Sequence, residues 1–116
     1  MAVFRETERA PVLIEEVGKP PFLSDTTLAT SGSPSQLGQP VTFTATVTSK
    51  YGAIPNGELV TFYDSKIEIG TGTTTSGVAT FTTSSLTARK HTIKATYAGD
   101  AEFKPSTGKV IQVVEE

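Results

Sequence analysis

The sequence predicts an all-β domain in which two sheets pack face to face, and three observations carry that prediction. After residue 25, apolar and polar residues alternate with a period of two over most of the chain. This spacing is typical of strands that have one face buried and the other in water. Threonine, the most frequent residue, is β-branched and favours pleated strands. Turn-forming residues separate the alternating segments at the spacing expected of a β-sandwich, roughly 8–12 residues.

Seven strands are predicted, and the clearest is Pro40–Ser49, where every second residue from Thr42 to Thr48 is a threonine. Glycines and a proline over 32–38 predict a loop before it. Asn56-Gly57 predicts a tight turn, because both residues tolerate positive φ. Two glycines within Ile67–Thr75 predict a weak, bulged or edge strand there. In chain order the predicted strands are Thr26–Ser31, Pro40–Ser49, Glu58–Asp64, Ile67–Thr75, Gly77–Thr83, Lys90–Ala98 and Lys109–Val114.

The overall composition suits one domain and argues against several classes of protein. The 116 residues include no cysteine and no tryptophan, so the core must be stable through packing alone. A net charge of −2 gives no strong attraction to nucleic acid or to an anionic membrane. No apolar run approaches the ~20 residues of a bilayer span. The alternation predicts that the core centres on Phe43, Phe62, Phe81, Ile93 and Tyr97.

Residues 1–25 differ from the rest of the chain, with three basic and five acidic side chains, three prolines and no alternation. We therefore predict an extended N-terminal arm over 1–25 and the sandwich over 26–116. Apolar residues outside the strand pattern suit an arm that docks on a partner protein. Folding back onto the sandwich, or an origin as the tail of a preceding domain, are the alternatives. The predicted docking residues are Phe4, Val12, Leu13, Ile14, Val17, Phe22 and Leu23.

Several ordered segments carry a resemblance to a known family. The run His-Thr-Ile-Lys-Ala-Thr-Tyr-Ala-Gly-Asp over 91–100, with segments 38–47, 57–64 and 77–81, resembles the bacterial immunoglobulin-like repeat family over about residues 26–114. The resemblance implies a seven-stranded immunoglobulin-like β-sandwich that serves as an interaction module. In such families these domains occur as repeats of secreted bacterial proteins and as appendages of tailed-phage virions.

His91 is the single histidine, and a hydrolytic site would need it to activate a nucleophile and to be oriented by a third group. Ser84, Ser85 and two aspartates are available in the sequence. A lone histidine at the corner before a strand is more typical of a structural hydrogen bond to nearby backbone. We therefore predict such a bond to the 86–90 corner and no catalytic residue.

The remaining side chains raise three kinds of candidate binding site. Asp64, Glu68, Asp100 and Glu102 could offer oxygens to calcium, but their spacing over two loops favours turn capping, so no metal or other cofactor is predicted. The lysines lack the interleaved aromatic residues of a single-strand nucleic-acid groove. Aromatic residues in loops can anchor a partner or stack on sugars. The candidate surface-binding group is Tyr51, Ile54 and Tyr63.

These observations favour a non-enzymatic structural module. We expect a phage capsid decoration protein whose arm docks on the particle and whose sandwich projects outward, with weak surface adhesion. The expected partners are the major capsid protein or another virion protein, and a host-surface glycan. The expected location is the virion, after assembly in the host cytoplasm, because residues 1–9 lack the apolar segment of a secretory signal. The alternative is a spacer or ligand-binding repeat of a secreted bacterial adhesin or cell-wall protein.

Overall fold

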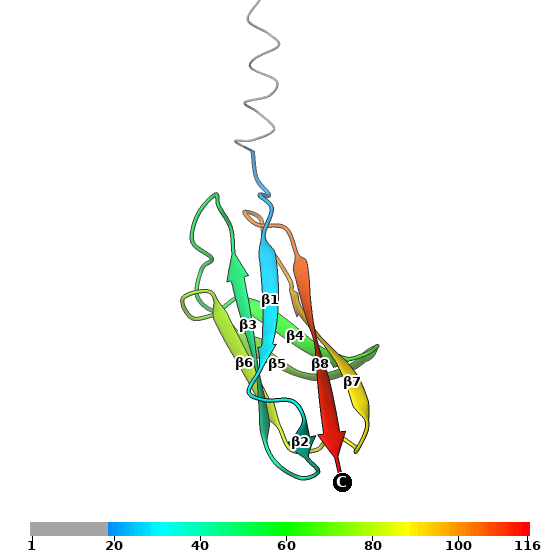
Figure 1. Cartoon of the computed structure of the whole chain (residues 1–116). Helices are drawn as coiled ribbons and strands as arrows, with labels where there is room; N and C mark the ends of the chain where they lie inside the picture. The colour runs from blue at the N-terminus through cyan, green and yellow to red at the C-terminus, as the bar shows by residue number, and fades with distance from the viewer. Residues whose placement is uncertain (1–18) are drawn as a thin grey trace, which may run out of the picture.

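The computed structural model describes residues 19–116, so the predicted docking residues Phe4, Val12, Leu13, Ile14 and Val17 lie outside the described range. Within that range the chain is all-β and forms two packed sheets (Figure 1). One sheet has the strand order β1-β3-β6 and the other β2-β8-β7-β4-β5. The strands are β1 (Asp25–Thr30), β2 (Ser35–Gln36), β3 (Val41–Thr48), β4 (Leu59–Asp64), β5 (Ile67–Thr73), β6 (Val78–Thr83), β7 (Lys90–Tyr97) and β8 (Ser106–Glu115).

The structure confirms the predicted sandwich but has eight strands rather than seven. The additional strand, β2, lies in the segment predicted as a loop and pairs in parallel with the end of β8. Two residues are too few to show an alternating pattern, and the partner strand lies at the far end of the chain. Sequence periodicity therefore could not detect β2.

The core is built from the inward positions that the alternation predicts. Phe43, Phe62, Ile93 and Tyr97 are each 0% exposed. Phe81 is only half-buried, because it lies on β6 at the edge of the smaller sheet. Its ring stacks on Phe62 at a centroid distance of 5.6 Å. It also covers Gly70 of β5, where an added Cβ would lie 2.2 Å from the ring.

Strands β1 and β8 approach each other closely and join the two sheets along one side. At Gly108 of β8, an added Cβ would lie 2.5 Å from the carbonyl oxygen of Thr26 in β1. Further along β8, the fully buried amide of Gln112 donates to the Gly32 carbonyl at 2.8 Å and accepts a hydrogen bond from the Thr30 hydroxyl. The backbone of Thr26 and Leu28 leaves no room for a side chain at position 108.

We expect Gly108→Ala to lower the free energy of unfolding by roughly 1–3 kcal/mol, because the added methyl group meets backbone that cannot move aside. Gly32→Ala is the matched control, since an added Cβ there meets no atom within 4 Å. The control should change stability by less than about 0.5 kcal/mol. Chemical denaturation of both variants checks the prediction, and equal losses would contradict the close approach of β1 and β8.

Candidate functional site

His91 lies at the start of β7, next to the corner that connects β6 with β7. The residue is 2% exposed. Its Nε2 lies 2.8 Å from the Thr87 carbonyl oxygen, which confirms the predicted bond to the corner backbone, and its Nδ1 lies 2.7 Å from Asp64 Oδ2. Because a carbonyl only accepts, Nε2 must carry a proton and donate it. Asp64, at the end of β4, holds the other side of the ring.

The hydrogen bonds of His91 suit a structural role and not a catalytic one. A hydrolytic histidine needs a nitrogen lone pair that faces a nucleophile. In this chain Nε2 faces a backbone carbonyl and Nδ1 faces a carboxylate. Ser85 lines the same shallow hollow as His91, but the ring has no nitrogen left to accept its proton. The contacts instead tie the end of β4 to the corner before β7.

An acidic pair lies at the opposite end of the β4–β7 ladder. A hydrogen bond to Asp100 raises the pKa of Glu58, while the Tyr97 hydroxyl opposes that shift by donating to Glu58 at 2.8 Å. The same bond with Glu58, together with the backbone N–H groups of Phe103 and Glu102, lowers the pKa of Asp100. Burial, and then the contact with Glu58, raises the pKa of Tyr97. The ionised Asp100 thus caps the turn that carries Phe103 into the core, as its predicted turn-capping role requires.

The structure separates the acids that were weighed as calcium ligands. Asp64 pairs with Ile93 near the start of β7, whereas Asp100 follows the end of that strand. Over residues 19–116, no three His, Cys, Asp or Glu side chains gather in a metal-binding arrangement. The same part of the chain has no helix long and apolar enough to cross a bilayer.

Phe22 packs on its own sandwich instead of being free to dock on a partner, which corrects its predicted role. Its backbone forms a bridge with Phe103, accepting from Lys104 N at 2.8 Å and donating to Glu102 O at 2.7 Å. Its ring stacks on Tyr51 at 4.9 Å. Packing against the sandwich therefore extends three residues ahead of β1, to Phe22. No pattern in the sequence predicts this contact, because Phe103 lies at the other end of the chain.

Leu23 is the one predicted docking residue of the described range that stays available. It is 63% exposed and lines a shallow hollow together with Lys50 and Tyr51. Its carbonyl accepts a hydrogen bond from the Ser49 hydroxyl at 2.8 Å. The backbone is thus fixed while the side chain points to solvent.

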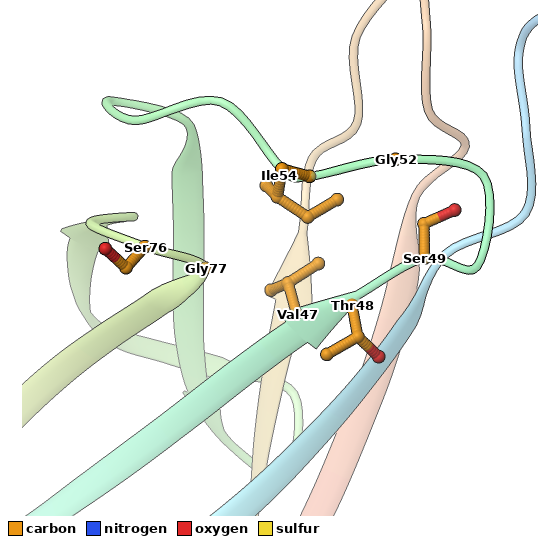
Figure 2. Close-up of a pocket in the computed structure, with 8 residues that line it drawn as sticks. Val47, Thr48, Ser49, Gly52, Ile54, Ser76 and Gly77 are labelled. Atoms are coloured by element: carbon orange, nitrogen blue, oxygen red, sulfur yellow. The ribbon is translucent and has the colours of Figure 1, made fainter.

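The candidate group Tyr51, Ile54 and Tyr63 does not form one surface. Ile54 is only 6% exposed, and Figure 2 shows its side chain directed toward Val47 at the floor of a groove. Tyr51 is half-buried beneath Phe22. Tyr63 lies on the outer face of β4, in a separate hollow. The sequence does not assign each loop to its end of the sandwich, so it could not show that the three side chains are apart.

His91→Ala should lower the free energy of unfolding by roughly 1–3 kcal/mol, because it leaves the Thr87 carbonyl and the Asp64 carboxylate without their buried partner. Arg89→Ala is the control at the same corner. Its guanidinium is 64% exposed and lies 4.0 Å from Asp64, so its removal should change stability by less than about 1 kcal/mol. Thermal unfolding of both variants tests the structural role, which a fully stable His91→Ala protein would rule out.

Phe22→Ala should destabilise the sandwich by about 1–3 kcal/mol, through the loss of a partly buried ring and its stacking on Tyr51. Leu23→Ala, one residue further along and largely exposed, should leave the melting temperature nearly unchanged. Urea titrations of the two variants give the comparison. If Phe22→Ala leaves the free energy of unfolding unchanged, Phe22 does not stabilise the sandwich and is available for docking.

Comparisons with known proteins agree with this architecture. No curated protein matches the chain. Among solved structures, the fibronectin(III)-like modules of Clostridium thermocellum CbhA are similar, with a TM-score of 0.59 and 20% identity over 78% of this chain and 94% of that one. At this identity the likeness supports the fold alone. The family model of the bacterial Ig-like domain (group 3) matches residues 27–115, which is most of the chain and nearly the whole sandwich. The chain therefore belongs to the bacterial Ig-like domain (group 3) family.

Proposed function

We propose that this protein is a non-catalytic structural and adhesive module of a phage particle. The segment before the sandwich attaches to the major capsid protein or another virion protein, and the sandwich points outward. Membership of an Ig-like family is consistent with a structural or adhesion-type module, and the virion role is our extension of it. The observation that carries the extension is the fixed entry of the chain into the sandwich.

The chain enters the sandwich at one end and leaves it at the other. Residues 19–24 approach the end that bears the 99–105 loop, whereas the C-terminus lies at the far end (Figure 1). Three contacts fix the entry: the Phe22–Phe103 bridge, the stacking of Phe22 on Tyr51, and a 2.6 Å hydrogen bond from the Ser24 hydroxyl to the Lys104 carbonyl. An attachment made before residue 19 would therefore hold the sandwich away from the attachment surface.

The geometry of the His91 corner supports a non-catalytic role. Both ring nitrogens are engaged, one by a backbone carbonyl and the other by Asp64. Neither can act as a general base without breaking a buried hydrogen bond. The adhesive part of the proposal depends on the outer faces of the sheets.

The alternative is a spacer or ligand-binding repeat of a secreted adhesin or cell-wall protein. Entry and exit at opposite ends of the sandwich also suit a row of linked domains. The two functions differ in where the chain is found, since a spacer repeat would have neighbouring domains and no affinity for a capsid.

The test compares the full chain with a variant that lacks residues 1–18, both mixed with tailed-phage capsids and separated by gradient sedimentation. All eight strands and the Phe22 anchor are retained in the variant, so its melting temperature should stay close to that of the full chain. We expect the full chain to sediment with capsids and the shortened chain to remain free. If both chains sediment equally with capsids, the docking surface must lie on the sandwich. If the full chain does not sediment with capsids, the virion role is wrong.

A further inference from the structure

The outer face of the larger sheet carries two rows of side chains across four strands, and a register shift of the β4–β5 pair lies between the rows. Cross-strand pairing aligns one residue each from β5, β4, β7 and β8 in every row. The first row consists of Thr71, Thr61, Thr96 and Thr107, and the second consists of Glu68, Tyr63, Lys94 and Lys109. We call these eight residues the platform.

Two lysines of the platform face each other on neighbouring strands. Lys94 of β7 and Lys109 of β8 are directly paired, and like charges in that position destabilise a sheet. No carboxylate of residues 19–116 lies within 4.0 Å of either ammonium group. This positive pair stands out in a chain whose net charge is −2. An anion placed between the two ammonium groups would remove the repulsion.

The side chains beside the lysine pair are suited to a sugar. Tyr63 is half-buried and directly paired with Lys94. The two residues line a hollow of about 390 Å³ together with hydroxyl and amine groups from Ser65, Lys66, Thr96 and Thr107. The Thr96 and Thr107 hydroxyls share one hydrogen bond of 3.1 Å. One of these hydroxyls still has a proton to donate, and both retain acceptor capacity toward a ligand.

We propose that the platform binds an acidic polysaccharide whose sugars carry carboxylates. A carboxylate would lie between Lys94 and Lys109 in charge-assisted hydrogen bonds. A sugar ring would contact Tyr63, and its hydroxyl groups would meet the threonine row. Strands lie about 4.8 Å apart, so each row offers an extended track of side chains to a linear polymer. Nucleic acid fits less well, because the platform has a single aromatic residue and no arginine on which bases could stack.

This inference rests on the adhesive part of the proposed function and specifies its ligand. The platform lies on β4, β5, β7 and β8, whereas the N-terminal entry is held by residues 22–24 and the 99–105 loop. Glycan binding and capsid attachment can therefore be lost separately.

The test measures binding of the full chain to polygalacturonate by calorimetry, with dextran as the neutral polymer. We expect binding to polygalacturonate alone, weakening as salt rises. The double variant K94Q/K109Q should bind at least about tenfold more weakly, since it loses two charge-assisted contacts. Its melting temperature should equal or exceed that of the parent chain, because a like-charge pair has been removed. Retained stability shows that any loss of binding is local.

The matched control is K50Q/K104Q, which makes the same change in net charge away from the platform and should bind as the parent chain does. Tyr63→Ala should weaken binding while leaving the fold intact. Failure of the parent chain to bind polygalacturonate, or an equal loss in both double variants, would overturn the proposal. Tighter binding to an oligothymidylate would also overturn it in favour of nucleic acid. We expect K94Q/K109Q to sediment with capsids as the parent chain does. If the parent chain binds polygalacturonate but does not sediment with capsids, only the virion role is refuted.

Discussion

The seam between β1, with the residues on either side of it, and β8 holds the two sheets together, and the rest of the structure depends on it. The chain has no cysteine, so this seam must be formed by packing and hydrogen bonds. Gly108 allows the backbones of β1 and β8 to approach, and the buried Gln112 amide connects β8 to the Thr30–Gly32 segment. At the other end of the seam, the Ser106 hydroxyl bonds to the Thr26 hydroxyl at 2.6 Å.

The same seam sets the direction in which the chain enters the domain. Ser24 bonds both to the Lys104 carbonyl and to the Ser106 hydroxyl, immediately after Phe22 has paired with Phe103. A segment held to residues 102–106 by several hydrogen bonds cannot rotate freely relative to the sandwich. Attachment through preceding residues would therefore transmit a defined orientation to the sheets, which gives the proposed projection from a particle its physical basis.

The buried polar side chains stabilise the fold, so the groups that could bind a ligand lie on the outer faces of the sheets. His91, Asp64 and Asp100 are used to fix corners and turns, and none of them is free for another role. The outer face of the smaller sheet is rich in threonine, with pairs such as Thr42–Thr82 bonded to each other at 2.7 Å. The larger sheet differs because Tyr63, Lys94 and Lys109 interrupt its threonines. This difference directs the proposed adhesion to the larger sheet.

The period-two pattern by itself determined seven of the eight strands and their inward faces, since alternation is a local property of a strand. It placed Phe43, Phe62, Ile93 and Tyr97 in the core, and the His91 contact was predictable because Thr87 is a near neighbour in the chain. Only the tertiary structure decided the rest. Four features join segments that are distant in sequence. They are the β2–β8 pairing, the packing of Phe22 against Phe103, the burial of Ile54, and the row that aligns Tyr63 with Lys94 and Lys109. Such contacts depend on strand order and register, and a single strand's pattern of alternation contains neither.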